Sequence, residues 1–431
     1  MDSSTIPPLR FSVPPCAPAS ARTVFKLLQQ LRHGTLTLHL PDGSVQRFGQ
    51  PHAEGDAHTT MVLKNWNVCG AVLKSGDIGL AESFIAGDWT SPHLVDLLQL
   101  FVRNRRELED VVYGSWAGRL LYRVRHLLNR NSRSTARKNI HAHYDLGNAF
   151  YSLWLDDTMN YSSAWFEGQT DKPLPDAQYA KVRRALQMAG VQRGDRVLEI
   201  GCGWGALVDM AVNEFSASVT GVTLSTEQLA FARQRMHSPN GIPTVPPHTD
   251  LRLQDYRDVQ GPFDRVSSVG MFEHVGLKNL ASYFRIIHDL LAPGGWALNH
   301  GITSTDPQNG ATSYGGGDFI DRYVFPNGEL AHIGTVLTTL QEGGLEAVDI
   351  ENLRRHYART LQCWSDAFEA KTERLKQLVD EKTWRIWRVY LVGCQWAFEH
   401  DEIALYQILC RRAGQAPDGL PWSRRWVYGA A

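Results

Sequence analysis

The stretch VLEIGCGWG (residues 197–205) decides the fold. A short apolar run, typical of a buried strand, reaches Glu199. Glycines follow at alternate positions, Gly201, Gly203 and Gly205, and a helical pattern begins after them. Glycine permits a tight turn and lets a ligand approach the backbone. The spacing GxGxG differs from the GxGxxG of dinucleotide-binding loops, and no GK[ST] follows to indicate a P-loop. The stretch therefore predicts a strand, a ligand-binding turn and a helix.

Strand and helix patterns alternate around this stretch, from about residue 141 to about residue 357. In chain order they are RVLEI, ALVDMAVNEF, ASVTGVTLS, STEQLAFARQRM, FDRVSSVG, YFRIIHDLL, WALNHGI and LEAVDIENL. Strands that alternate with helices predict a parallel sheet covered by helices. The chain from Arg359 onward is rich in tryptophan and tyrosine, and we expect it to be helical.

The first part of the chain predicts a smaller α+β domain. TVFKLLQQLRHG (23–34) has the pattern of an amphipathic helix, and TLTLHLPDGSVQRFG (35–49) alternates by twos around a PDG turn, which indicates a hairpin. A further strand and helix follow in residues 61–89. Residues 1–20 are rich in proline and serine, so we expect a disordered tail. We divide the chain into this tail, an N-terminal domain over 21–139 and a larger domain over 140–431.

The composition is that of an ordinary globular protein. The 431 residues are 43% hydrophobic and carry a formal net charge of -1, so charge gives no argument for binding nucleic acid. None of the six cysteines forms a CxxC pair, so no zinc site or disulfide framework is indicated and a reducing compartment fits best. No secretion signal is evident, and no apolar run approaches the ~20 residues that span a bilayer. We expect a cytoplasmic protein without a metal ion.

Arginines are concentrated between residues 103 and 138. Within WAGRLLYRVRHLLNR (116–130) the apolar side chains fall at helical spacing, and arginines flank them from Arg119 to Arg130. An interfacial helix attracted to anionic lipid is one interpretation. A helix that packs on the core and leaves a basic face in solvent is the other. The sequence leaves both open.

The glycine loop resembles that of Rossmann-like S-adenosylmethionine methyltransferases, which have E-x-G-x-G-x-G after a strand. In most such enzymes an acidic residue closes the second strand and holds the ribose hydroxyls. Here that strand ends in Thr223, and Gln228, one turn into the next helix, could make these hydrogen bonds instead. After the third strand, Gln254 and Asp255 in QDYRD could meet the adenine end. A solvated turn is the alternative for QDYRD.

An acid and an imidazole stand together in SVGMFEHVG (268–276), where the apolar run FDRVS ends. A helix start would explain Glu273, because a carboxylate is stabilised near the positive end of a helix. The alternative is that Glu273 belongs to a catalytic site at the end of the strand.

Several blocks together resemble one family, the cyclopropane-fatty-acyl-phospholipid synthases with the related mycolic acid cyclopropane synthases. They occur in that family's order from His141 to about Leu361: HYDLGN, LDDTMNYSSAWF, VLEIGCGWG, GVTLSTEQ, QDYRD, FDRVSSVGMFEHVG, a PGG turn, FIDRYVFPNGEL and HYARTL. The small domain and the helical tail resemble those of the longer bacterial synthases. The resemblance implies a class I methyltransferase fold of the α/β type with these two additions.

The resemblance also implies a reaction. A methyl group passes from S-adenosylmethionine to a cis double bond of a phospholipid acyl chain, and loss of a proton from that methyl closes a cyclopropane ring. An alkene is a poor nucleophile, so the site must align it with the methyl group, exclude water and hold a base. In the family the base is a bound bicarbonate ion. The family further implies a homodimer formed through the N-terminal domain and a peripheral protein on the inner face of the membrane.

The resemblance assigns catalytic residues by position. Glu273 resembles the carboxylate that contacts bicarbonate, and His300 resembles the imidazole that donates to it, with the backbone of Ile302 nearby. Tyr357 resembles the tyrosine whose hydroxyl completes the bicarbonate site, and His274 is then a structural residue or a more distant one. His143, in HYDLGN, is a further catalytic candidate.

The cofactor residues are assigned in the same way. Tyr161 and Ser162 match positions at the methionine end of S-adenosylmethionine. The remaining cofactor candidates lie in the glycine loop and after the next two strands: Glu199, Gly201, Gly203, Gly205, Thr223, Gln228, Gln254 and Asp255.

Two cysteine positions of the family bear on the product and the mechanism. Ser163 stands where the family usually has a cysteine beside bicarbonate. Serine can donate a hydrogen bond equally well, so either the site is retained or the product becomes a methyl or methylene branch. Cys394, in VGCQWAF, matches a second cysteine of the family. Because methylation of an alkene requires no thiolate, we interpret Cys394 as a core residue, with a catalytic role as the alternative.

Two functions other than that of a synthase also fit parts of the sequence. Small-amine N-methyltransferases share the HYD, YS, GCGWG and FEH blocks but lack the N-terminal domain, and an inactive lipid-binding scaffold would need no catalytic set. The late aromatic residues fit either a plain core or the wall of an acyl tunnel: Trp364, Phe368, Trp384, Trp387, Tyr390 and Trp396.

Overall fold

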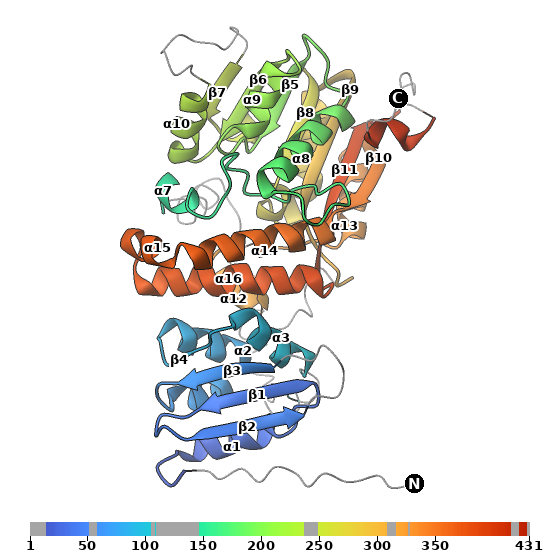
Figure 1. The fold of residues 1–431 in the computed structure, drawn as a ribbon. Coiled ribbons are helices and arrows are strands. Elements are labelled where there is room, and N and C mark those ends of the chain that lie inside the picture. Colours follow the sequence, from blue (N-terminus) through green and yellow to red (C-terminus); the bar gives the residue numbers. More distant parts are fainter. Residues whose placement is uncertain are drawn as a thin grey trace. The chain divides into compact units, whose positions relative to one another are not determined.

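The computed structural model describes residues 14–50, 58–104, 108, 146–236, 249–307, 316–325, 328–414 and 422–428. The chain forms two compact units (Figure 1). The N-terminal unit comprises Met1–Asn129, Tyr314–Tyr323 and Asp380–Trp396, and the larger unit comprises Arg130–Ser313, Val324–Val379 and Ala397–Ala431. Two late segments therefore group with the N-terminal part of the chain, which the division at residue 139 did not include.

The N-terminal unit is built on a four-stranded sheet with the order β2-β1-β3-β4. Its strands are β1 (Gly34–His39), β2 (Val45–Gln50), β3 (His58–Leu63) and β4 (Trp89–Thr90), and its helices are α1 (Ala19–Leu28), α2 (Asn67–Ile85) and α3 (Leu94–Arg103). Strands β1 and β2 pair antiparallel, so the predicted hairpin is confirmed. The tail prediction was too long, because Ala17 packs in the core and α1 begins at Ala19.

Side-chain contacts explain why the late segments belong to this unit. Arg385 of α16 (Glu381–Glu399) donates to the carbonyl of Phe84 at 3.1 Å and lies 5.0 Å from the centre of that ring. Tyr323 of α12 (Gly316–Tyr323) donates to Glu82 of α2 at 2.9 Å. Contacts between residues more than 200 positions apart cannot be read from local periodicity.

The larger unit is built on a seven-stranded sheet with the order β10-β11-β9-β8-β5-β6-β7. The strands are β5 (Arg196–Ile200), β6 (Ser218–Thr223), β7 (Thr249–Leu253), β8 (Phe263–Val269), β9 (Leu291–Ser304), β10 (Leu345–Asn352) and β11 (Ile403–Arg412). Strands β5 to β9 pair in parallel with their neighbours among themselves, as predicted. The predicted Rossmann-like α/β fold follows from this arrangement.

Helices cover both faces of this sheet. Among the described residues, the α-helices that lie wholly in this unit are α7 (Asn148–Tyr151), α8 (Leu174–Met188), α9 (Ala206–Asn213), α10 (Thr226–Arg235), α11 (Leu280–Leu290), α13 (Ile333–Glu342), α14 (Arg354–Ala370) and α15 (Thr372–Leu378). Val197 of β5 packs in one core cluster with Val208 of α9, whereas Leu198 packs in a second cluster with Phe284 of α11. A strand covered on both faces needs apolar side chains in both directions, which explains the run VLEI.

The C-terminal part of the chain is helical to Glu399, as predicted. It then forms a strand that was not predicted from the sequence. Strand β11 lies between β9 and β10 and runs antiparallel to both, so the sheet is mixed. Ile408 pairs with Ile350 of β10 and is completely buried. A strand buried on both faces has a continuous apolar sequence, and periodicity cannot distinguish it from a buried helix.

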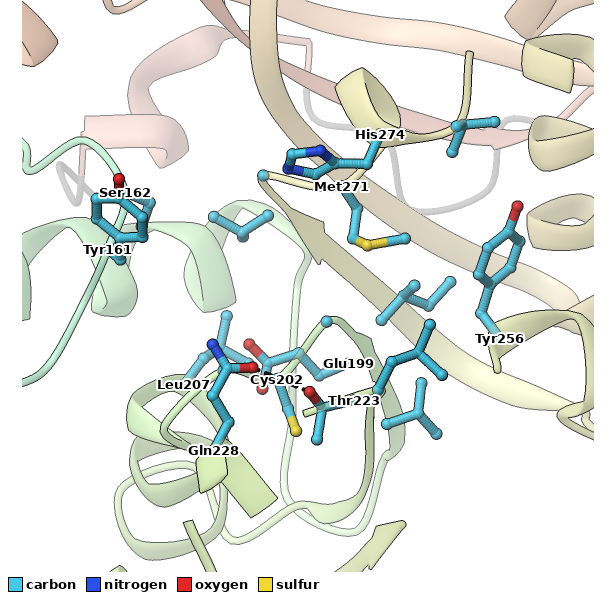
Figure 2. A pocket seen from close by; sticks show the side chains of 18 of the residues that line it. Tyr161, Ser162, Glu199, Cys202, Leu207, Thr223, Gln228, Tyr256, Met271 and His274 are labelled. Carbon is cyan, nitrogen blue, oxygen red and sulfur yellow. Dashed lines mark hydrogen bonds between the residues drawn. The ribbon is translucent and has the colours of Figure 1, made fainter. Parts of the chain in front are cut away.

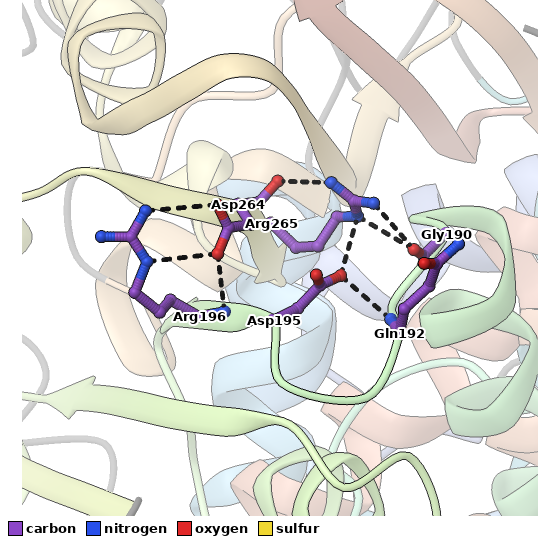
Figure 3. A network of polar contacts seen from close by, with 6 residues as sticks. All are labelled: Gly190, Gln192, Asp195, Arg196, Asp264 and Arg265. Atoms are coloured by element: carbon purple, nitrogen blue, oxygen red, sulfur yellow. Dashed lines mark hydrogen bonds and ion pairs between the residues drawn. The ribbon is translucent and has the colours of Figure 1, made fainter. Parts of the chain in front are cut away.

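A polar network fastens the start of β5 to the start of β8 (Figure 3). The backbone N–H of Arg196 donates to Asp264 at 2.9 Å, and its guanidinium donates to the same carboxylate. Arg265 donates to the carbonyl of Gly190 at 3.0 Å and pairs with Asp195 at 3.4 Å. These contacts set the two strands in register at their amino ends, opposite the ends that carry the glycine turn.

The basic segment at residues 119–130 lies outside the described residues, so its two interpretations both stand. Within the ranges that the structure describes, no helix is both long enough and apolar enough to cross a bilayer.

We predict that Ile408→Ala lowers the free energy of unfolding by about 2–4 kcal/mol, because the substitution leaves a cavity in the buried core that packs on the sheet. Ile350→Ala is the matched control, since Ile350 is the paired residue on the edge strand and is 40% exposed. It should cost under about 1 kcal/mol. Urea unfolding followed by circular dichroism measures both values. Equal losses would contradict a central β11.

Candidate active site

A cavity of about 260 Å³ lies where β5, β6 and β8 end (Figure 2). Figure 2 shows Glu199, Thr223 and Gln228 on one side of the cavity, with Met271 and His274 across from them. Nine of the ten cofactor candidates line it: Tyr161, Ser162, Glu199, Gly201, Gly203, Thr223, Gln228, Gln254 and Asp255. Gly205 is the exception, and it precedes α9 as its N-cap.

The glycine turn forms one wall of the cavity. Gly201 has a φ of 80°, and a Cβ there would lie 2.8 Å from Cγ of Met271. Gly203 has a φ of 52°, and nothing lies within 4 Å of the place its Cβ would take. The first position thus needs glycine for conformation and packing, whereas the second leaves open space at the backbone for a ligand.

A buried carboxyl group and a buried ammonium group line the same cavity. Glu199 ends β5, is 4% exposed, and its Oε2 has no hydrogen-bond partner. Burial raises the pKa of Glu199 to about 8, while the charge of Lys181 opposes the rise. Burial also lowers the pKa of Lys181 to about 8, against the attraction of Glu199 and Asp156. A cationic ligand group beside Oε2 would favour the ionised carboxylate.

The end of β6 carries a short hydroxyl–amide network in place of an acid. The hydroxyl of Thr223 donates to Oε1 of Gln228 at 3.0 Å. Ser225, the N-cap of α10, accepts from the backbone N–H of Gln228 at 3.2 Å. Because Oε1 is already an acceptor for Thr223, the amide NH2 of Gln228 is the group left for the cavity. A donor at this place suits the hydroxyl oxygens of a ribose.

The QDYRD turn combines both interpretations given to it. Asp255 lines the cavity but also accepts from the backbone N–H of Arg257 at 3.0 Å and from its guanidinium at 2.8 and 2.6 Å. Gln254 donates to the carbonyl of Asp258 at 2.8 Å. Both side chains thus hold the turn as well as facing the ligand space. The sequence analysis missed Arg257 as the partner of Asp255.

The loop with Tyr161 and Ser162 is attached to helix α8. Gln178 donates to the carbonyl of Ser162 at 2.9 Å, and Lys181 donates to the Ser162 hydroxyl at 2.8 Å. The ring of Tyr161 packs against Trp364 at 5.4 Å. The sequence analysis missed Lys181. A signal for it exists, because a lysine on the apolar, core-facing side of an amphipathic helix is unusual.

A second group of candidates lies just beyond the end of β8, beside the part of β9 that extends past it. Glu273 belongs to a 3-10 turn after β8 and is 7% exposed. Its Oε1 accepts from the backbone N–H of Ile302 at 3.4 Å, and its Oε2 has no partner. A Cβ on Gly301 would lie 2.8 Å from that Oε2, so the carboxyl group packs directly on β9. Burial raises its pKa to about 7.

His300 lies beside this contact on β9. It is 1% exposed, and neither ring nitrogen has a hydrogen-bond partner. Burial, with the charges of Lys181 and Arg184, lowers its pKa to about 3, so the ring is neutral with one donor and one acceptor. The two unsatisfied ring nitrogens of His300 suit a small ligand that both donates and accepts, and the unsatisfied Oε2 of Glu273 suits a ligand that donates.

The segment that contains Ser163 is bonded to α14, the helix that carries Tyr357. Ser163 is completely buried and its hydroxyl donates to the carbonyl of Ala164 at 3.0 Å. The backbone N–H of Ala164 donates to Thr360 at 3.0 Å, one turn from Tyr357. Tyr357 is buried, with its ring 5.9 Å from Trp364. The same Trp364 contacts Tyr161, so this aromatic cluster joins α14 to the cofactor loop.

Three candidates remain: Cys394, His143 and His274. Cys394 belongs to the N-terminal unit, and burial raises the pKa of its thiol to about 12. His143 lies outside the described residues. His274, taken as structural or distant, lines the cavity with its ring 5.1 Å from Phe325, and burial lowers its pKa to about 4. Among the residues that are described, no group of three or more His, Cys, Asp or Glu side chains could hold a metal ion.

The late aromatic residues divide between the two units. Trp364 and Phe368 are buried in the larger unit, where both rings pack against Trp154. The remaining four belong to the N-terminal unit: Trp384, Trp387, Tyr390 and Trp396.

Three comparisons with known proteins agree. Residues 131–408 match the family model described as mycolic acid cyclopropane synthetase. A probable fatty acid methyltransferase of Pseudomonas putida is 39% identical over 397 residues, covering 88% of this chain and 98% of that protein. The cyclopropane-fatty-acyl-phospholipid synthase of Escherichia coli K12 is 34% identical over 360 residues, covering 83% and 89%. The mycolic acid cyclopropane synthase CmaA1 complexed with SAH and CTAB is 32% identical with a TM-score of 0.60, covering 64% of this chain and 98% of that one.

We predict that Glu273→Gln stabilises the chain at pH 8 by about 1–3 kcal/mol and has little effect at pH 4. Below pH 4.5 both folded and unfolded chains hold the proton. Between pH 4.5 and about 7 the unfolded chain loses it while the folded chain keeps it, so the free energy of unfolding of the wild type falls as pH rises. Above about pH 7 the folded chain bears a buried charge that glutamine lacks.

Urea unfolding at several pH values measures this difference. Glu373→Gln, at an exposed position on α15, is the control and should track the wild type. A Glu273→Gln effect that stays constant across the range would contradict the raised pKa.

Proposed function

Because the chain belongs to the mycolic acid cyclopropane synthetase family, we propose that it methylates a cis double bond of a phospholipid acyl chain and closes a cyclopropane ring. The chain is an S-adenosylmethionine-dependent methyltransferase of the class I fold, so the family, fold and enzyme class predicted from the sequence are confirmed. The observation that carries the finer proposal is that Oε2 of Glu273 and both ring nitrogens of His300 are buried without hydrogen-bond partners.

The cavity residues would hold the cofactor at both ends. S-adenosylmethionine, when bound, supplies a methyl group activated by its sulfonium. Glu199 would accept from the ammonium of the methionine end, and the amide NH2 of Gln228 would donate to the ribose. Asp255 and Gln254 would lie at the adenine end, where they hold the turn after β7. Fixing both ends leaves the methyl group in one orientation, which an alkene needs because it is a weak nucleophile.

Buried aromatic side chains suit the charge that develops on the acyl chain. Tyr161, Trp364 and Tyr357 form a contiguous cluster next to the cofactor loop. Ring faces attract a cation without attacking it, and a dry cluster keeps water from trapping it. These side chains therefore favour a cationic centre on the lipid and protect it until the proton leaves.

Glu273 and His300 would handle that proton. Bicarbonate, held between Oε2 of Glu273 and a ring nitrogen of His300, would supply the base. Glu273 has a pKa of about 7 and can take a proton at Oε2 near neutral pH. His300 is neutral and can donate through one nitrogen without adding a positive charge. Tyr357 of α14 and Ser163, in the loop before α8, would complete the surroundings of the anion.

A second candidate product is a methyl or methylene branch on the same acyl chain. The name of the Pseudomonas putida relative favours it, because that protein is a probable fatty acid methyltransferase. Ser163, in place of the usual cysteine, is the residue through which the two products would differ. Attachment to the inner face of the membrane, formation of a homodimer, a cytoplasmic location and the absence of nucleic-acid binding remain predictions from the sequence.

We predict that the full-length protein converts cis-unsaturated phospholipid vesicles to cyclopropane lipids in the presence of S-adenosylmethionine and bicarbonate. Proton NMR of the acyl chains should show cyclopropane methylene signals and loss of olefinic signals. Mass alone does not separate a cyclopropane from a methylene branch, since each adds one CH2. Branch signals without cyclopropane signals would establish the second product, and no lipid product with cofactor bound would direct the search to amine substrates.

We predict opposite outcomes for two variants in the same assay. Glu273→Gln should lower kcat by roughly 100-fold or more, because loss of a positioned proton acceptor typically costs about 10²–10⁴-fold. Cys394→Ser should retain most of the activity, because a thiol with a pKa of about 12 supplies no thiolate near neutral pH. If Cys394→Ser loses activity while its cofactor affinity and thermal stability stay normal, then Cys394 has a catalytic role.

A further inference from the structure

Lys181 is a buried cation in the cofactor cavity that the mechanism above does not use. It projects from α8, is 3% exposed, and lines the cavity beside Ser162 and Glu199. Its ammonium donates to Oδ1 of Asn160 at 3.0 Å and to the Ser162 hydroxyl at 2.8 Å. Both acceptors are neutral. A buried charge that is hydrogen-bonded only to neutral groups is unfavourable. A ligand that places a negative charge near the ammonium of Lys181 would therefore bind strongly.

The bond from Lys181 fixes the direction of the Ser162 hydroxyl. An ammonium group has only donors, so Oγ of Ser162 must act as the acceptor. The hydroxyl proton is then left to donate elsewhere, and Ser162 faces the cavity (Figure 2). The arrangement presents an O–H donor, backed by a positive charge, to whatever occupies this end of the cavity.

The charges in this part of the cavity match the two charges of an α-amino acid. Glu199 offers an unpartnered carboxyl oxygen, which suits an ammonium group. Lys181 and Ser162 offer a cation and a hydroxyl donor, which suit a carboxylate. A ligand with only one of the two charges would match one of these groups and leave the other without a ligand group of opposite charge.

We propose that Lys181 is a positioning residue that acts through Ser162, directing its hydroxyl to the carboxylate of the methionine end of the cofactor. This inference rests on the proposed function only in taking S-adenosylmethionine as the ligand. It assigns to Lys181 the preference of the cavity for a cofactor that still carries its carboxylate.

A purely structural role for Lys181 makes a different prediction. In that case Lys181 would only attach the loop with Asn160 and Ser162 to α8. Gln178 makes a second attachment through the carbonyl of Ser162 at 2.9 Å, so the loop keeps a tie to the helix when Lys181 is changed. Removal of the ammonium should therefore affect recognition of the carboxylate more than the shape of the cavity.

The test is calorimetric binding of three ligands to the full chain. They are S-adenosylhomocysteine, its decarboxylated analogue, which keeps the amine, and methylthioadenosine, which lacks the amino-acid end. The wild type should bind S-adenosylhomocysteine about 10–100-fold more tightly than the decarboxylated analogue. Lys181→Met should reduce this ratio to within about threefold and leave the affinity for methylthioadenosine unchanged. Lys172→Met, which removes a surface ion pair with Glu167, should behave as the wild type.

Ser162→Ala provides a second route to the same answer if Lys181→Met is poorly folded. It should reduce the preference for S-adenosylhomocysteine over the decarboxylated analogue to a similar degree. The double variant should lose no more of this preference than either single variant. An equal loss of affinity for all three ligands in Lys181→Met, or a wild type that does not distinguish the first two, would overturn the proposal. A wild type that binds none of the three would instead overturn the cofactor assignment on which it rests.

Discussion

The site depends on one geometric constraint, that parallel strands paired side by side end at the same edge of a sheet. Strand β5 pairs in parallel with both β6 and β8, and β8 pairs in the same way with β9. Glu199, Thr223 and Glu273 lie far apart in the sequence, but each lies in the last residues of a strand or shortly after a strand, and these strands end together. The turns beyond these strands therefore meet at one edge, and side chains from several turns line one cavity. The network between Arg196 and Asp264 holds the opposite ends, so the register that aligns the turns is fixed away from the chemistry.

The features that local sequence determines were predicted well, and the features that depend on distant pairing were not. The turn at Gly201 and the replacement of an acid by Gln228 could be predicted because each involves neighbours within a few residues. Strand β11 could not, because its apolar sequence fits helix and strand equally until its partners are known. Lys181 was missed because its role depends on Ser162, whose loop precedes α8 and folds back on it.

Four buried ionisable groups share the site, and the protein alone does not satisfy them. Glu199 and Glu273 each keep an oxygen without a partner, and His300 keeps both ring nitrogens. Lys181 donates to two neutral oxygens, Oδ1 of Asn160 and Oγ of Ser162. Buried groups of this kind lower the stability of the folded chain. Their presence therefore indicates that bound molecules supply the missing hydrogen-bond partners and opposite charges. Ligands that bind the folded chain alone also raise its stability, which couples occupancy of the site to the integrity of the sheet.

The position of β11 between β9 and β10 means that the sheet is completed late in synthesis. Ile403 of β11 pairs with Ser304 of β9, so about 100 residues of synthesis separate the two partners. At 5–20 residues per second, a ribosome takes on the order of 5–20 s to cover that distance. During this interval β9 has an open side and β10 has no neighbour in the sheet, since its partner is β11. An unpaired strand edge is a template for association with other chains. The nascent protein thus passes through a stage in which its growing sheet requires protection until the last strand emerges.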